Sequence, residues 1–282
     1  MLTDRSRRVR EARKLHRRAA RARAGMFLAE GPKAVREALG RTTDARAGHV
    51  VEIFAAESTA PGHTGLLDHA VRAGVTVHIA DDAALASLSE TVTPQGLVAV
   101  CRQVSVGLDE ALAGPPSLVA VLADVRDPGN AGTVIRCADA AGAGAVILAG
   151  DSVDPHGGKC VRASAGSLFH LPIVTGVPTA EALRSLGDRG LTIVAADSSG
   201  GTDLDAAQDD GLLANPTAWL FGNEAWGLPD GLLGLADRVV RIPIHGRAES
   251  LNLATAAALC LYASARAQRH GAGYGRSSGG AS

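Results

Sequence analysis

Polar residues gather in three short stretches, each of which includes or follows an apolar run typical of a β-strand. Asn130 and Arg136 lie in the first stretch, Glu224 lies in the second, and Ser250 and Asn252 lie in the third. The stretches are DVRDPGNAGTVIRCADAAGA (124–143), WLFGNEAWGLP (219–229) and VVRIPIHGRAESLNLATAAALCLYA (239–263). Loops at the ends of parallel strands are where α/β proteins bind ligands. We therefore expect the three stretches to meet at one site.

Among the side chains of these stretches, Arg136 is the one that most clearly requires a charged partner. It lies on a predicted helix of otherwise small or apolar residues, where a guanidinium needs a carboxylate or a phosphate. The functional interpretation is contact with a phosphate or a ribose, and the alternative is an ion pair with Glu224. The preceding loop, 127–132, has backbone N–H groups that could face an anion. It lacks the Lys and Ser/Thr of a P-loop and the GxGxxG spacing, so a nicotinamide-dependent oxidoreductase is not favoured.

The elements that position these residues alternate between predicted strands and helices. This alternation predicts an α/β fold, with a mostly parallel sheet in the C-terminal part and a smaller α/β domain before it. Ser250 and Asn252 stand where the last long helix begins, as capping residues would. The predicted parts are a basic arm (1–25), a small domain (26–103), a linker (104–117), a larger domain (118–270) and a disordered Gly/Ser-rich tail (271–282).

Composition excludes several classes of protein. The chain has 282 residues, of which 46% are hydrophobic but only 3% aromatic, so its cores must consist of Ala, Val and Leu. No apolar run reaches the roughly 20 residues of a membrane span, and the N-terminus is too basic for a secretory signal. The four cysteines are scattered without metal-ligand spacing. We expect no metal site and a cytoplasmic location.

Charge is distributed unevenly along the chain. The formal net charge is −1, but residues 1–25 hold ten Lys/Arg against two acidic residues, a net of +8, and the remainder holds 18 basic and 27 acidic residues, a net of −9. A basic arm on an acidic body is typical of nucleic-acid binding, and the alternative is a solvated arm without a partner. The arm is predicted to be a helix, free or docked on RNA. The candidate RNA-binding residues are Arg13, Arg17, Arg18, Arg21 and Lys33.

Taken together and in this order, the three stretches resemble the signature motifs of the SpoU/TrmH family of RNA 2′-O-ribose methyltransferases. The segment FLAEGPKAVREAL, 27–39, resembles the start of the ribosomal-protein-like substrate-binding domain that many members carry. The resemblance implies S-adenosylmethionine as cofactor, a deep trefoil knot in the parallel-sheet domain and a homodimer. The stretch Arg162–Ser167 resembles an RxSxGS-like segment of the family, expected at the RNA surface or the dimer contact.

The resemblance also implies roles for single residues. The cofactor would be held largely by the main chain of Leu220, Gly222, Ile242, Pro243 and Leu251. The catalytic set would be Arg136, Asn130, Glu224, Ser250 and Asn252. In this hypothesis Arg136 grips a phosphate and stabilises negative charge on the attacking 2′-oxygen, while Glu224 orients Arg136 and the two asparagines order the loops and the ribose.

The expected substrate is large-subunit (23S) ribosomal RNA, because this pairing of domains is frequent among ribosomal RNA enzymes. The modification would serve housekeeping or resistance to an antibiotic. The alternatives are a transfer RNA 2′-O-methyltransferase and a non-catalytic RNA-binding protein with the same fold. Binding of S-adenosylmethionine distinguishes the enzyme from the binding protein.

Overall fold

The computed structural model of the chain describes residues 1–40 and 48–274, without the side chains of 270–274. These residues form two compact units. Unit 1 consists of Met1–Val104 together with Asp154–His170, and unit 2 consists of Ser105–Val153 together with the chain from Leu171 onward. The division differs from the predicted domains, because residues 154–170 of the larger predicted domain belong to unit 1, and the predicted linker belongs to unit 2 apart from Val104.

Unit 1 is built on a four-stranded mixed sheet with the order β1-β4-β2-β3, in which only β2 and β3 are parallel. The strands are β1 (Met26–Glu30), β2 (Val50–Ala56), β3 (Thr76–Ala80) and β4 (Leu97–Arg102). The helices are α1 (Arg7–Arg13), α2 (Arg18–Ala24), α3 (Pro32–Leu39), α4 (Thr64–Arg72), α5 (Asp82–Leu88) and α8 (Gly158–Ser164), with 3-10 turns η1 (Lys14–His16), η2 (Ala60–His63) and η3 (Ser167–Phe169). The predicted α/β character of this region is confirmed.

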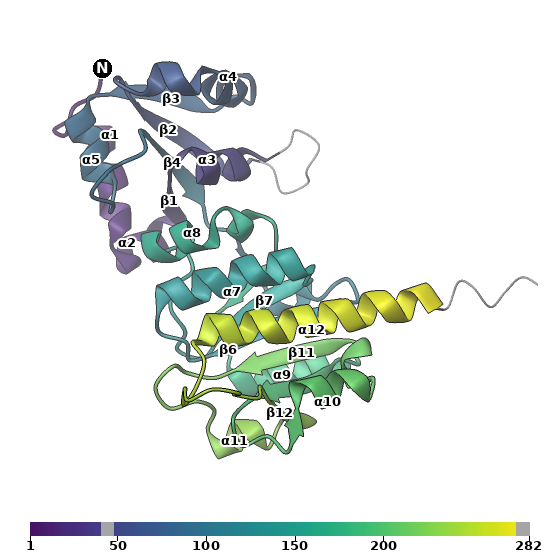
Figure 1. The fold of residues 1–282 in the computed structure, drawn as a ribbon. Coiled ribbons are helices and arrows are strands. Elements are labelled where there is room, and N and C mark those ends of the chain that lie inside the picture. The colour runs from purple at the N-terminus through teal and green to yellow at the C-terminus, as the bar shows by residue number, and fades with distance from the viewer. Residues whose placement is uncertain (41–47, 275–282) are drawn as a thin grey trace, which may run out of the picture. The chain divides into compact units, whose positions relative to one another are not determined.

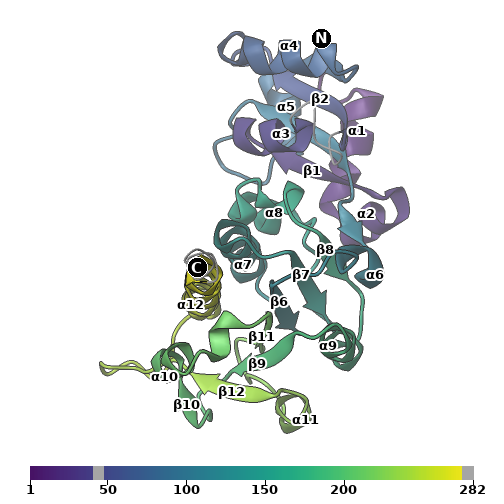
Figure 2. The same ribbon diagram turned by 90° about the vertical axis from the view of Figure 1, so that its right-hand side faces the viewer.

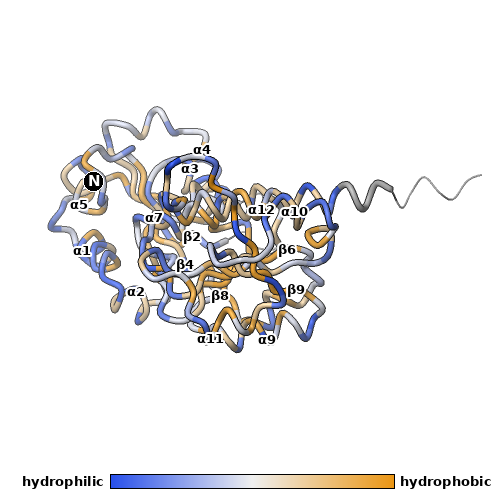
Figure 3. Tube along the Cα trace, turned by 60° about the horizontal axis from the view of Figure 1, so that its bottom comes forward, coloured by the Kyte–Doolittle hydropathy of each residue, from blue (hydrophilic) through white to orange (hydrophobic). Residues whose placement is uncertain are grey.

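The basic N-terminal residues are packed into unit 1. Val9, Ala12 and Leu15 are buried in a hydrophobic cluster with residues of β1, β2, β4 and α5. Their spacing of three places them on one side of α1 and η1, while Arg10 and Arg13 between them are exposed. Figure 3 shows hydrophilic stretches along α1 and α2. Three apolar residues make only a short amphipathic pattern, and the many arginines around them make this pattern hard to recognise in the sequence.

The segment 154–170 joins unit 1 although both of its ends continue into unit 2. The sequence predicts one helix over 161–170, but α8 ends at Ser164. Ala165 and Gly166 have φ angles of 51° and 100°, which break the helix before η3 begins. Asp154 accepts hydrogen bonds from the Arg21 guanidinium, which ties this segment to α2.

Unit 2 contains an eight-stranded sheet whose recorded pairings are all parallel, in the order β10-β12-β9-β11-β6-β7-β8-β5. The strands are β5 (Ser105–Val106), β6 (Leu118–Ala123), β7 (Ala145–Ala149), β8 (Ile173–Thr175), β9 (Thr192–Ala196), β10 (Thr202–Asp203), β11 (Thr217–Phe221) and β12 (Arg238–Arg241). The helices are α6 (Leu108–Ala111), α7 (Pro128–Ala141), α9 (Thr179–Asp188), α10 (Leu204–Asp209), α11 (Asp230–Leu233) and α12 (Leu253–Tyr274), with the 3-10 turn η4 (Leu212–Ala214). The predicted parallel sheet is confirmed.

Helices cover both faces of this sheet (Figures 1 and 2). Helices α7 and α12 lie side by side on one face, and α6, α9 and α11 lie on the other, where their apolar residues close a core with β6, β7 and β9. Trp219 is fully buried and donates a hydrogen bond from its indole to Ser264 of α12, 2.8 Å away. Residues 271–274 of the predicted tail belong to α12, and its remainder lies outside the described residues.

Candidate active site

A chain of side-chain hydrogen bonds joins the three polar stretches in unit 2. The Asn252 amide donates to Asn130 Oδ1 at 2.9 Å, and the Asn130 amide donates to Glu224 Oε1 at 3.2 Å. Asn252 precedes α12, Asn130 lies in the first turn of α7, and Glu224 lies in the loop after β11. All three residues lie near the carboxyl ends of β6, β11 and β12, where ligands bind in open α/β sheets. The structure therefore brings the three stretches together, with Asn130 at the centre.

The helix that carries Asn130 begins earlier than the sequence suggests. Asp127 is the N-cap of α7 and accepts from the Asn130 N–H at 2.8 Å, and Pro128 occupies the first helical position. Residues 128–132 are thus the first turn of a helix and not a free loop. The Asn130 N–H, one of the groups expected to face an anion, is taken by Asp127 instead.

Glu224 connects the loop after β11 to the segment between β6 and α7. Its carboxylate accepts from the backbone N–H groups of Arg126 at 3.2 Å and Asp127 at 3.1 Å, in addition to the Asn130 amide. Partial burial alone would raise the pKa of Glu224, but the backbone N–H groups of Glu224, Arg126 and Asp127 and the Asn130 amide hold it below the usual value. Glu224 is therefore a carboxylate at neutral pH and a poor proton acceptor.

Arg136 does not meet Glu224, contrary to the expected ion pair and orienting contact. Its side chain is exposed on α7, and no hydrogen bond or ion pair joins it to any residue that the structure describes. Asn130 lies six positions earlier, about 120° around the helix from Arg136, so the two side chains leave α7 in different directions. An exposed guanidinium without a partner in the described part of the chain is available to an external anion.

The loop after β11 is shaped by Gly222 and by Asn223, a residue that the sequence analysis did not select. The Asn223 amide donates to the Asp124 carbonyl at 2.6 Å, and its Oδ1 accepts from the Ala225 N–H at 2.8 Å. A Cβ on Gly222 would lie 2.4 Å from the Gly227 carbonyl carbon, so the close approach that needs glycine is to the loop itself. An Asn next to a Gly at a strand end is a turn signal that could have identified Asn223.

The third stretch leaves much of its main chain without partners. Residues 242–251 make no backbone hydrogen bond to any other residue within 1–40 and 48–274. Ile242, Pro243 and Leu251 are half-buried, and Ser250 is exposed. Asn252 alone caps α12, because its Oδ1 accepts from the N–H groups of the second and third residues beyond it, at 2.9 and 3.3 Å. Ser250 does not act as a cap.

The predicted RNA-binding residues in unit 1 fall into two groups. The first group is exposed and has no side-chain partner among the described residues: Arg13, Arg17, Arg18 and Lys33. Arg21 differs from the prediction, since it is only 6% exposed and donates to Asp154 Oδ2 at 2.7 Å and to the carbonyls of Leu15 and His16. It stabilises the corner between η1 and α2 instead of facing solvent.

The RxSxGS-like segment also lies in unit 1, and most of its side chains are buried or half-buried. Ser164 and Ser167 are buried, and the Ser164 hydroxyl donates to the Val161 carbonyl at 2.8 Å. Arg162 is half-buried beside Glu30 and Glu90.

The part of the chain that the structure describes holds no group of three His, Cys, Asp or Glu suited to a metal, and none of its helices has the length and hydropathy of a membrane span.

Comparisons with family models and with known proteins point to the same family. A model of the SpoU rRNA Methylase family matches residues 117–262, and a model of the MRM3-like substrate binding domain matches residues 6–99. The 23S rRNA (guanosine(2553)-2'-O)-methyltransferase RlmP of Bacillus subtilis is 33% identical over 256 residues, which cover 90% of this chain and 94% of that protein.

Solved structures agree with these matches. The AdoMet-bound rRNA methyltransferase from Sinorhizobium meliloti has a TM-score of 0.78 at 31% identity, covering 94% of this chain and 95% of that one. The SpoU methyltransferase AviRb from Streptomyces viridochromogenes in complex with AdoMet has a TM-score of 0.79 at 31% identity, covering 94% and 100%.

Proposed function

Because this chain belongs to the SpoU rRNA Methylase family, we propose that it transfers the methyl group of S-adenosylmethionine to a ribose 2′-hydroxyl of large-subunit ribosomal RNA. The observation that carries the proposal is the hydrogen-bond chain Asn252–Asn130–Glu224, which joins the three polar stretches at one edge of the parallel sheet. RlmP, a 23S rRNA 2'-O-methyltransferase, supports the substrate and the reaction, and AviRb, a SpoU methyltransferase in complex with AdoMet, supports the cofactor.

The loops of unit 2 fit S-adenosylmethionine. The ten residues 242–251 offer backbone N–H and carbonyl groups that make no backbone hydrogen bond to any residue the structure describes. We propose that the main chain of Leu220, Gly222, Ile242, Pro243 and Leu251 holds the cofactor. The cofactor supplies an activated methyl group on a sulfonium sulfur, and the residues of the chain orient the hydroxyl that receives it.

Arg136 is proposed to stabilise the attacking ribose oxygen. A 2′-hydroxyl is a poor nucleophile, and negative charge grows on its oxygen as the proton leaves. A guanidinium keeps its proton at any physiological pH, so Arg136 acts as a cation that grips the neighbouring phosphate and stabilises that charge. Glu224 is a poor base for the reason given above, and the proton passes to the phosphate or to water. Asn130 and Asn252 hold the loops, and the exposed hydroxyl of Ser250 is available to the ribose.

RNA binding is proposed to use the outer face of the N-terminal helices. Arg13, Arg17 and Arg18 are exposed and have no acidic partner among the described residues. Several such cations can neutralise phosphates, and the affinity that they supply falls as the salt concentration rises. The alternative of a non-catalytic RNA-binding protein would use the same surface without a cofactor.

We further propose a homodimer, a trefoil knot formed by the segment from β12 to α12, and a cytoplasmic location with the RNA. The dimer is supported by an apolar stripe on α12, where Leu259 and Tyr262 are 46% and 52% exposed. The knot is supported by the packing of α12 against α7 and by Gln268, whose amide donates to the carbonyls of Ser117 and Asn215.

The proposal is tested by combining calorimetry with methyl transfer. S-adenosylmethionine is titrated into the purified protein, and labelled cofactor is then supplied with unmodified 23S rRNA or with unmodified transfer RNA. Cofactor binding and labelling of the ribosomal RNA are expected. Labelling of transfer RNA alone would replace the substrate, and RNA binding without cofactor binding would favour the non-catalytic alternative.

A further inference from the structure

Unit 1 contains a cavity that the methyl-transfer site does not use. Its volume is about 240 Å³, and three segments of the chain line it. The segments are Glu30–Ala34 at the junction of β1 and α3, Thr91–Gln95 before β4, and Val161–Ala165 at the end of α8. Pockets for whole small molecules usually measure about 300–1,000 Å³. This cavity is smaller, so it suits one part of a larger ligand.

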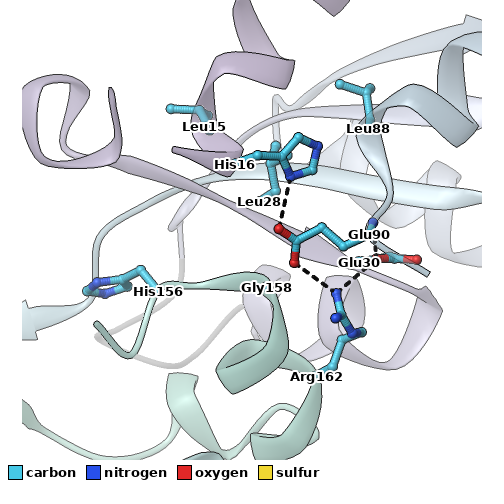
Figure 4. A pocket seen from close by; sticks show the side chains of 9 residues that line it. All are labelled: Leu15, His16, Leu28, Glu30, Leu88, Glu90, His156, Gly158 and Arg162. Atoms are coloured by element: carbon cyan, nitrogen blue, oxygen red, sulfur yellow. Dashed lines mark hydrogen bonds and ion pairs between the residues drawn. The ribbon is translucent and has the colours of Figure 1, made fainter. Parts of the chain in front are cut away.

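A neighbouring cavity can be set aside. It shares Glu30 and Arg162 with the first, but it measures only about 10 Å³, which is room for one water molecule at most. In Figure 4 the side chains of His16, Glu30, Glu90 and Arg162 converge on it, with Arg162 between the two carboxylates. This cluster stabilises the wall of the larger cavity and leaves no space for a ligand.

The larger cavity presents hydrogen-bond donors and acceptors that have no partner in the described part of the chain. Lys33, Thr93 and Gln95 are exposed, and their side chains make no hydrogen bond to any residue that the structure describes. Gln95 lies against Gly31, where a Cβ would approach its Oε1 to 2.7 Å. Gly31 has a φ of 91°, which favours glycine, and its missing side chain lets the Gln95 amide fold over the edge of the cavity.

Glu30 supplies an acceptor in the wall of the cavity. Its side chain is only 9% exposed, and its Oε1 accepts from the hydroxyls of Ser89 and Thr91. Its Oε2 has only long contacts, at 3.4 Å, with the Glu90 N–H and with Arg162 Nη1. Because both contacts are long, a closer donor could take the place of either one at Oε2.

The lining does not suit a bare anion. Ala34, Val161 and Ala165 provide small apolar surfaces, and the acceptor Glu30 would repel a phosphate within the cavity. Apolar surfaces combined with donors and acceptors at one edge match a nucleobase. Proteins that read RNA sequence take unpaired bases out of the stack and bond their edges in this way.

We infer that this cavity receives one unpaired base of the RNA substrate that carries an amino group, namely adenine, cytosine or guanine. The amino group of the base donates to Glu30 Oε2, the Gln95 amide bonds the rest of the edge, and Lys33 contacts the adjoining phosphate. The inference rests on the proposed function, because it assigns the RNA of that reaction to this site. It also makes α8, which lies within the methyltransferase part of the sequence, a part of RNA recognition.

Binding of unmodified 23S rRNA to matched variants is the first test. Gln95→Ala is expected to weaken binding at least roughly fivefold through the lost base contact. Lys33→Ala is expected to weaken it by a similar factor and to reduce the slope of log affinity against log salt by about one. Val92→Ala and Arg36→Ala are the controls, since Val92 lies in the same loop and Arg36 on the same helix, and neither lines the cavity. Equal affinities for lining and control variants would overturn the inference.

Photo-crosslinking is the second test and does not depend on affinity. A benzophenone amino acid replaces Thr93 at the cavity, or Arg72 on α4 as a control, and crosslinked nucleotides of the 23S rRNA are mapped. From residue 93, one dominant crosslink to an unpaired adenine, cytosine or guanine is expected, and its yield should fall in the Gln95→Ala background. A crosslink to uracil, to paired nucleotides, or identical to the control would overturn the inference.

The two proposals fail in different ways. If the wild-type protein methylates the RNA but the crosslinks fail, the base-binding cavity is wrong and the proposed function stands. If the crosslink to one unpaired base forms but no methyl group is ever transferred, the proposed function is wrong and the cavity remains an RNA site.

Discussion

The two units differ in how deeply their clusters of polar side chains are buried. In unit 1, Arg21, Asp154 and His156 form a cluster whose side chains are 7%, 14% and 3% exposed. In unit 2, Asn130, Glu224 and Asn252 form a chain of hydrogen bonds whose members are half-buried or exposed. Buried charges that lose a partner are costly, whereas exposed polar groups can exchange a protein partner for water or a ligand. Substitutions of these polar residues should therefore mainly lower the stability in unit 1 and mainly lower the activity in unit 2.

The largest effect that separates the units is expected for Asp154→Ala. This change leaves the Arg21 guanidinium buried without its carboxylate, which should cost about 3–5 kcal/mol of unfolding free energy. Urea denaturation measures the loss. The matched change in unit 2, Glu224→Ala, removes a more exposed carboxylate and should cost much less stability, and an equal loss for both would contradict the comparison.

Arg136→Ala is expected to give the converse result. Removing one group that stabilises a developing oxyanion typically lowers the rate about 10²–10³-fold. Because Arg136 is exposed and has no partner among the described residues, stability should change by less than about 0.5 kcal/mol. Arg184→Ala, at an exposed position of α9, is the control for charge. Methyl transfer at the wild-type rate by Arg136→Ala would show that its assigned role is wrong.

Acid should destabilise the protein more through the unit 1 cluster than through the unit 2 chain, because the pKa of Asp154 is depressed more strongly than that of Glu224. Burial alone would raise the pKa of Asp154, but hydrogen bonds from His156 and Arg21 hold it well below the ordinary range. A depressed folded pKa gives stability that is fully present above the unfolded value, about 3.9, and lost as the pH falls toward the folded value. Unfolding free energy measured from pH 6 to pH 2 should fall for the wild type, and Asp154→Asn should lack that part of the decline. Parallel curves would contradict the assignment.

The smallest effect is expected at Asn252, where capping and site geometry can be separated. Asn252→Ser keeps a side-chain oxygen that can cap α12 but removes the amide that donates to Asn130, so stability should be preserved within a few tenths of a kcal/mol. Asn252→Ala removes both and should cost about 1 kcal/mol. Methyl transfer should fall in both variants. A rate that follows stability, normal in the Ser variant and low only in the Ala variant, would show that Asn252 is a cap alone.

Much of the fold was predictable because the strands are apolar, short and separated by strong helix signals. The Asp81 cap of α5 and the Gly residues after α3 and α7 are local features that the sequence displays directly. The packing of residues 154–170 into unit 1 was not predictable, because it depends on contacts between residues far apart in the chain, such as Arg21 with Asp154.

The candidate site was predictable in its residues but less so in its contacts. Asn130, Glu224 and Asn252 were expected together and meet as a chain of hydrogen bonds, whereas Glu224 bonds the backbone of Arg126 and Asp127 instead of Arg136. A sequence shows which charges are available, but the direction in which a helical side chain points depends on where the helix begins. Here the Asp127-Pro128 start of α7 sets that direction.

The most direct measurement is the chemical identity of the RNA product. Unmodified 23S rRNA is incubated with the protein and S-adenosylmethionine, digested to nucleosides and examined by mass spectrometry, with Arg136→Ala in parallel. The account predicts one nucleoside methylated at its ribose 2′-oxygen with the wild type and almost none with the variant. A methyl group on a base, or equal ribose methylation by both proteins, would contradict it.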